Sequence, residues 1–194
     1  MLKPVKCLVY EYKGRVPHRD VLAEKGLRWD WVDKDVIRLF FASKPNLNTT
    51  FSKFLNKGYI GLVLSSGDNW LTYCWMTTPY SLGPHHLPAW VKDLNAYWIF
   101  YSHTHEKYRG RGFYKAALQC QINRALQDSQ GKATIYIDTA AQNIPSRRAI
   151  ITSNFEPKGV ITCYKLKFPK LKSFVYGKWN KDQEHPPLET GVIY

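Results

Sequence analysis

The stretch Tyr108-Arg-Gly-Arg-Gly-Phe-Tyr-Lys-Ala-Ala-Leu118 carries the most information about the fold. It follows an apolar, aromatic run over 96–101 that predicts a strand, and it opens a segment with helical periodicity. Glycines let the backbone turn and approach a ligand closely, while the first amides of a helix have no intrahelical partner. A strand, a glycine turn and a helix in this order therefore predict an anion-binding site at the helix N-terminus.

The composition is that of a basic globular protein. Its 194 residues include 28 Lys and Arg against 15 Asp and Glu, which gives a formal net charge of +13, and 44% of them are hydrophobic. This length accommodates one domain with its own core. The charge favours a polyanionic partner (nucleic acid, a nucleotide, an anionic membrane or an acidic glycan), or else it forms a solvated basic surface.

The sequence also bears on the cellular compartment. No run is apolar over the length that a membrane span needs, and the charged segment 1–13 lacks the long apolar stretch of a signal peptide. The cysteines contain no C-x-x-C pair, which indicates reduced, buried side chains: Cys7, Cys74, Cys120 and Cys163. We therefore expect a cytoplasmic protein without a transmembrane segment.

Hydrophobic periodicity and turn residues predict a mixed order of strands and helices. We expect strands at 6–12 and 36–41, a short helix near 50–56, a β-hairpin with strands 59–66 and 70–78, a loop at 79–88 that contains His85-His86, a strand at 96–105, a helix ending near 129–132, a strand at 133–138, a helix at 144–153, and strands at 160–168 and 173–179. This order predicts an α/β fold of the α+β type, with a mixed, mainly antiparallel sheet and flanking helices. Residues 1–179 are expected to form a single domain, and 180–194 a C-terminal tail.

Two motifs resemble those of the GNAT superfamily of acyl-CoA N-acyltransferases. The first, Q/R-x-x-G-x-G/A, reads Lys107-Tyr-Arg-Gly-Arg-Gly112 here, with lysine in the Q/R position. The second is an asparagine, a small residue three positions later and a Gly-Phe after a helix, and it reads Asn143 to Phe155. Asn154 stands in the glycine position, where asparagine tolerates the left-handed conformation that ends a helix. The resemblance covers the motif-bearing core 96–168 and implies a GNAT-like acyltransferase fold.

The resemblance also implies an activity. In this family an acetyl or other short acyl group moves from acyl-CoA to a primary amine, which attacks the thioester directly. We expect acetyl-CoA or coenzyme A as co-substrate, no metal, and an amine-bearing small molecule as acceptor. The aromatic residues of the N-terminal half suit a ring such as an amino-sugar, or else pack in the core. The sequence does not decide between a monomer and a homodimer.

The cofactor-binding residues that the resemblance implies fall into groups that suit different parts of coenzyme A. Helix amides and basic side chains over 109–115 suit the pyrophosphate and ribose phosphate of coenzyme A. The strand end over 102–104 would hold the pantetheine arm and the acyl carbonyl, and Asn143 would support the pantetheine. Asn143 also suits the N-cap of the helix that it precedes, which needs no ligand. The full set is Ser102, His103, Thr104, Arg109, Gly110, Arg111, Gly112, Phe113, Tyr114, Lys115, Asn143 and Ser146.

The proton-transfer groups are less well defined. An amine with a pKa of about 10.4 is almost entirely protonated at neutral pH, so a base or a water relay must remove a proton. We expect His103 and Glu106 to be catalytic, with His105 and Asp138 as further candidates. His-x-His spacing also suits a metal, but the sequence places no third ligand. At Ile150 many family members carry a tyrosine that protonates the coenzyme A sulfur, so the proton donor is not assigned.

Two other functions stay open. Some family members acylate aminoacyl-tRNA, and basic charge with exposed aromatic residues suits RNA. The other alternative is a non-catalytic acyl-CoA-binding protein. Salt-dependent retention on RNA would favour the first, and cofactor binding without thiol release the second.

Overall fold

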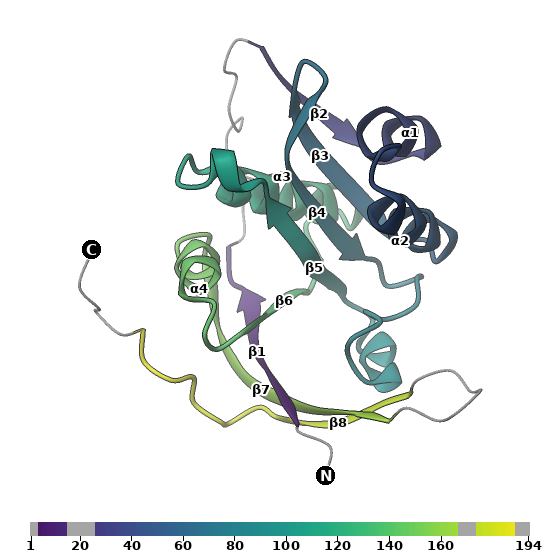
Figure 1. Cartoon of the computed structure of the whole chain (residues 1–194). Helices are drawn as coiled ribbons and strands as arrows, with labels where there is room; N and C mark the ends of the chain where they lie inside the picture. Colours follow the sequence, from purple (N-terminus) through teal and green to yellow (C-terminus); the bar gives the residue numbers. More distant parts are fainter. Residues whose placement is uncertain (1–3, 15–25, 167–173, 189–194) are drawn as a thin grey trace.

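One mixed sheet organises the molecule (Figure 1). The computed structural model describes residues 4–14, 26–166 and 174–188. Within them the sheet has eight strands in the order β2-β3-β4-β5-β6-β1-β7-β8. The strands are β1 Val5–Tyr12, β2 Leu27–Trp31, β3 Ile60–Ser66, β4 Asn69–Thr77, β5 Tyr97–Thr104, β6 Ile135–Ala140, β7 Phe155–Leu166 and β8 Phe174–Asn180. The helices are α1 Lys34–Phe41, α2 Pro45–Asn56, α3 Phe113–Asp128 and α4 Ile144–Ile151, with short 3-10 turns η1 Ala89–Leu94 and η2 Glu106–Tyr108.

Neighbouring strands are antiparallel except for β5 and β6, which run parallel. This arrangement confirms the predicted α/β fold with a mixed, mainly antiparallel sheet and flanking helices. The β3–β4 hairpin, β5, β6 and the two helices after the glycine turn lie within a few residues of their predicted positions.

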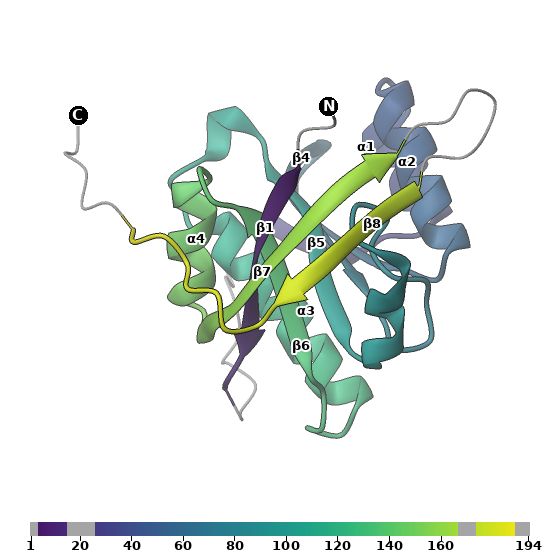
Figure 2. The ribbon, with the colours of Figure 1, turned by 90° about the horizontal axis from the view of Figure 1, so that it is seen from below.

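Helices cover both faces of the sheet. On one face α1 and α2 bury Phe41 and Phe51 against Trp75 of β4. On the other face α3 and α4 bury Leu118 and Ile150 against the opposite sides of the central strands. Figure 2 shows β7 and β8 crossing the front of the molecule, with α4 at one side and the α1–α2 pair at the other. The apolar core is therefore divided into two layers by the sheet.

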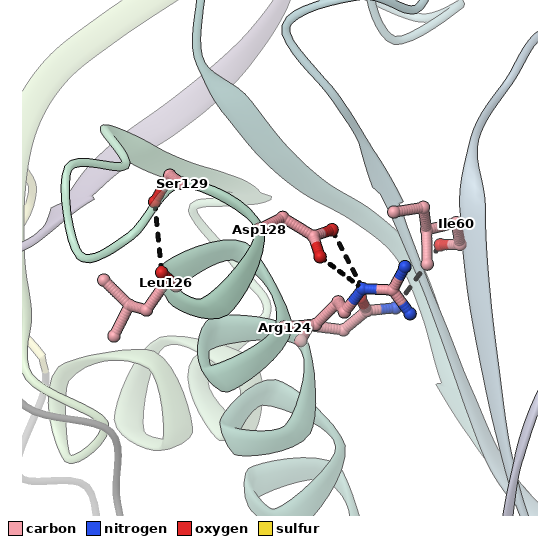
Figure 3. A network of polar contacts seen from close by, with 6 residues as sticks. Ile60, Arg124, Leu126, Asp128 and Ser129 are labelled. Atoms are coloured by element: carbon pink, nitrogen blue, oxygen red, sulfur yellow. Dashed lines mark hydrogen bonds and ion pairs between the residues drawn. The ribbon is translucent and has the colours of Figure 1, made fainter.

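The C-terminal half of α3 is held against the β2–β3 end of the sheet. The Arg124 Nε donates to both carboxylate oxygens of Asp128 at 2.9 and 2.8 Å, and the guanidinium lies 5.1 Å from the centre of the Trp31 ring. Figure 3 shows this ion pair on α3 beside Ile60 of β3. One side chain thus completes an i,i+4 pair along the helix and contacts the edge strand.

The strand predicted at 36–41 is wrong, because this segment forms helix α1. Asp33 caps its N-terminus by accepting a hydrogen bond from the Val36 amide at 2.8 Å. The buried residues Ile37, Phe40 and Phe41 recur at the spacing of one helix face. The run of β-branched and aromatic residues suggested a strand, but the cap and the 3–4 spacing decide the conformation.

Other element boundaries also differ from the prediction. Helix α2 begins at Pro45, several residues earlier than expected, with proline in the first turn where its missing N–H costs nothing. Strand β7 begins at Phe155 rather than Val160, and β2 was not predicted. The predicted strand ends at 167–168 and 173, and the last part of the tail, 189–194, lie outside the described residues.

The segment after β8 packs back onto the sheet. His185 lies edge-on to the Tyr10 ring, with 4.6 Å between ring centres, and its Nε2 is 2.8 Å from the Gly159 carbonyl oxygen. The Pro186 carbonyl accepts a hydrogen bond from the buried Arg147 of α4. The first part of the predicted tail, up to residue 188, is therefore in contact with β1 and α4.

Phe51 tests the layer between α2 and the sheet. It is fully buried among the rings of Phe41, Tyr73 and Trp75, so Phe51→Ala is expected to lower the free energy of unfolding by about 3–5 kcal/mol. Leu39→Ala, on the exposed side of α1, should change it by less than about 0.5 kcal/mol. Urea unfolding measures both, and equal losses would contradict this packing.

Candidate active site

The parallel strands β5 and β6 part shortly after they meet. Their register pairs are Tyr97 with Ile135, Trp98 with Tyr136 and Ile99 with Ile137. Beyond Ile99, β5 continues to the turn before α3, whereas β6 leads toward α4 (Figure 1). On this side, the backbone of β5 past Ile99 therefore has no strand partner in the described part of the chain, and its polar groups can bind a ligand. We call this point the fork.

A β-bulge lies on β5 directly past the fork. His103 pairs with Tyr73 of β4 and Phe100 with Trp75, so that Tyr101 and Ser102 together face the single residue Cys74. Tyr101 adopts φ of +48°, which is rare for a residue with a side chain. The bulge redirects the strand, and it leaves the Tyr101 side chain 38% exposed on the α1–α2 face.

The glycine turn leads from β5 into α3. Gly110 and Gly112 have φ of +77° and +79°, and a Cβ on either would meet no atom within 4 Å. Gly112 is the N-cap and offers no side chain, and the first helical hydrogen bond runs from the Ala116 amide to its carbonyl. The amides of residues 113–115 therefore precede the first intrahelical bond, as the sequence predicted for an anion site.

Basic side chains surround this turn. Arg109, Arg111 and Lys115 are all exposed. The Arg109 Nε donates to the Thr104 carbonyl at 3.4 Å and its guanidinium lies 3.6 Å from the Glu106 carboxylate, while Arg111 lies over a tyrosine ring at 5.6 Å. The helix N-terminus and these cations give the turn a positive potential that suits phosphate groups.

A surface pocket of about 300 Å³ opens on the α1–α2 face, beside the end of β5. His103 stacks on the Tyr73 ring with 5.8 Å between centres, and burial, together with the Arg109 and His105 charges, lowers the pKa of His103. The structure thus brings together the two residues that the sequence predicted to be catalytic. The pocket is lined by Lys44, Leu47, Trp70, Tyr73, His103, His105 and Glu106.

A histidine–carboxylate pair lies at the fork. Asp138 is the first residue of β6 past the parallel pairing, and its carboxylate accepts hydrogen bonds from Trp98 Nε1 at 2.7 Å and from His86 Nε2 at 2.9 Å. Asp138 is a candidate base from the sequence and the His85-His86 pair lies in a predicted loop, but nothing in the sequence connects the two. The two partners are 52 positions apart, and no spacing rule relates a loop histidine to a strand carboxylate.

Two absences hold for the described residues. They contain no group of three or more His, Cys, Asp or Glu side chains that could hold a metal ion. None of their helices combines the length and apolar character that crossing a bilayer requires.

The fold is shared with solved structures of GNAT acetyltransferases. A protein of the GNAT acetyltransferase family from Novosphingobium aromaticivorans superposes with a TM-score of 0.57 at 14% identity, over 84% of this chain and 64% of that one. The fold is the GNAT fold. A GCN5-related N-acetyltransferase from Sphaerobacter thermophilus gives a TM-score of 0.52 at 12% identity, over 95% of this chain and 55% of that one. A tandem GNAT protein from the clavulanic acid biosynthesis pathway gives 0.53 at 10% identity, over 79% and 50%.

No family model matches the chain. No curated protein matches it either. The chain spans between 50% and 64% of the length of these three GNAT structures.

Within this GNAT fold, α3 and α4 meet at a pair of hydroxyl groups. The Tyr114 hydroxyl is 3.1 Å from Ser146 Oγ, and burial raises the pKa of Tyr114. Phe113 directs its side chain into the core, so that only its backbone is placed to meet a ligand at the turn. Ile150 is fully buried, and its hydrocarbon side chain cannot donate a proton to the coenzyme A sulfur.

Asn143 is the N-cap of α4. Its side-chain oxygen accepts a hydrogen bond from the Ser146 amide at 3.3 Å, so the capping interpretation is confirmed. An oxygen that satisfies a helix amide also fixes where α4 begins, directly after the diverging strand β6.

Removal of this cap should be measurable. Asn143→Ala is expected to lower the free energy of unfolding by about 1 kcal/mol, because one helix amide loses its partner. Asn143→Asp keeps an acceptor and should stay within a few tenths of a kcal/mol of the wild type. Urea unfolding compares the three proteins, and an Ala variant as stable as the wild type would refute the capping role.

Proposed function

We propose that the protein transfers an acetyl or other short acyl group from acyl-CoA to the primary amine of a small molecule. The observation that carries this proposal is the open edge of β5, which runs from the fork at Ile99 to the glycine turn before α3. Backbone groups along this edge can bind an extended chain with amide groups, and the turn can bind its phosphates.

The dimensions support coenzyme A at this edge. The phosphates would lie on the amides of 113–115, with Arg109, Arg111 and Lys115 around them. From the turn back to the fork, about five residues of β5 span roughly 16 Å. The pantetheine arm is an extended chain with two amides, so it would run along β5 and bring the thioester near the fork.

The pocket on the α1–α2 face supports an amine acceptor. Glu106 supplies a carboxylate for an ammonium group, and the half-buried Trp70 offers an aromatic surface for a ring, as in an amino-sugar. His103 and Glu106, which the sequence predicted to be catalytic, both line this pocket, where they would hold the acceptor beside the thioester. A neutral amine then attacks the thioester carbonyl, and coenzyme A leaves as the thiol.

Ligand-induced thermal stabilisation tests the cofactor site first. Acetyl-CoA and coenzyme A are expected to raise the melting temperature more than ATP does at the same concentration, because binding to the native state stabilises it. A panel of primary amines, including amino-sugars, is then screened with thiol detection. A shift no larger than that with ATP would refute the site, and salt-dependent retention on RNA would then favour aminoacyl-tRNA or RNA. Binding without thiol release would indicate a non-catalytic acyl-CoA-binding protein.

Gly110 tests where the phosphates bind. Gly110→Asp is expected to weaken acetyl-CoA binding by about tenfold or more, because its charge would lie beside the phosphates. Gly110→Asn is the matched control, since asparagine has the same shape, tolerates positive φ and carries no charge. Equal dissociation constants for the two variants, measured by calorimetry, would contradict the phosphate assignment.

A further inference from the structure

His86 contacts both strands at the point where they part. Its ring stacks over Phe100, the first residue of β5 past the last parallel pair, with 6.0 Å between centres. Its Nε2 binds the carboxylate of Asp138, the first residue of β6 past the same pair, at 2.9 and 3.1 Å. One loop side chain therefore bridges the open end of the fork.

The hydrogen bonds define the orientation of this histidine. The Asp138 side chain is only 7% exposed, and Trp98, whose indole nitrogen can only donate, holds one of its oxygens at 2.7 Å. A carboxylate accepts, so His86 Nε2 carries the proton and the neutral ring presents a lone pair on Nδ1. The His86 side chain is 32% exposed, and no hydrogen bond to Nδ1 occurs among the described residues.

The surroundings shift the pKa values of the adjacent His85 and His86 in opposite directions. Burial disfavours a charge on His86, but the Asp138 carboxylate and its hydrogen bond outweigh it, with Cys163 as a weaker contributor, and raise the pKa of His86. Burial, together with the His86, Lys57 and Lys165 charges, lowers the pKa of His85 to about 4. His85 therefore stays neutral near pH 7, with its ring beside those of Phe54, Phe100 and Tyr101.

We propose that His86 is the general base for the acceptor amine and that Asp138 is its positioning residue. This inference rests on the proposed acyl transfer and names the residue that would touch the reacting amine. A carboxylate that holds one imidazole nitrogen and stabilises the imidazolium is an effective way to activate the other nitrogen as a base.

The position of the fork favours His86 over His103 as the base. His103 lies near the end of β5, close to the glycine turn where the phosphates would bind. The thioester would lie at the other end of the pantetheine arm, near Phe100 and Asp138. In this arrangement His103 and Glu106 bind the acceptor in the pocket, and His86 removes its proton where the acyl group is attacked.

The ammonium of the acceptor gives one proton to His86 Nδ1, and the neutral amine forms a C–N bond to the thioester carbonyl carbon. The C–S bond breaks, and the thiolate takes a proton from the imidazolium, directly or through water, which returns His86 to its neutral form. The amide nitrogen loses its remaining extra proton to solvent, so an ammonium and acetyl-CoA yield an amide, coenzyme A thiol and one proton.

Kinetics of the full chain with acetyl-CoA and an amine from the panel test this assignment. His86→Gln is expected to lower kcat by about 100-fold or more, while acetyl-CoA still raises its melting temperature. His86→Ala should regain activity when imidazole is added. Asp138→Asn should lower kcat. It should also move the acidic limb of the pH–rate profile to lower pH, because it removes the carboxylate charge that raises the pKa of His86.

His185→Gln is the matched control, because His185 lies on the C-terminal segment beside Tyr10, and it should keep the wild-type kcat. His103→Gln is expected to act mainly through KM for the amine, with a smaller loss of kcat than His86→Gln. An active wild type with unchanged kcat in His86→Gln, or loss without imidazole rescue, would overturn the inference alone. A wild type that binds acetyl-CoA but acylates no amine would refute the proposed function and this inference together.

Discussion

The parting of β5 and β6 after three parallel pairs is the constraint on which the rest of the molecule depends. A buried strand must satisfy its backbone groups, and β5 pairs with β4 along one side, but on the β6 side it has no strand partner past Ile99 in the described parts of the chain. The bulge at Tyr101 bends β5 at the same level, and the cap at Asn143 starts α4 where β6 ends. The two strand ends therefore lead to two separate helices, with an open edge between them.

This geometry places an anion site and a histidine-lined pocket on opposite sides of β5. The turn with Gly110 and Gly112 presents amides and cations to an anion, and it lies beside α3. The pocket with His103 and the pair His86–Asp138 both face the α1–α2 layer. In the proposed function, a ligand bound in the fork would reach from the first side to the second, so the sheet would lie between the phosphate site and the acceptor site.

Local patterns in the sequence predicted most of the central fold. The glycine turn between an apolar strand and an amphipathic helix, and the Asn-capped helix that follows, are encoded by neighbouring residues, and they lie where predicted. The prediction for 36–41 was wrong because β-branched and aromatic residues occur in both strands and buried helices, and the Asp33 cap and the 3–4 spacing of the buried residues distinguish the two. The His86–Asp138 pair is a long-range contact between a loop and a strand, which no local periodicity reports.

The contact between Arg147 and the segment after β8 has a consequence for how the chain can be shortened. Arg147 is 3% exposed, and its guanidinium binds the Tyr10 hydroxyl, the Ala141 carbonyl and the Pro186 carbonyl. A chain that ended at β8 would lose one of these acceptors and uncover a cation in the wall of α4. Residues 181–188 therefore cover the Arg147 side chain of α4. A purification tag or fusion partner should be attached after them rather than replace them.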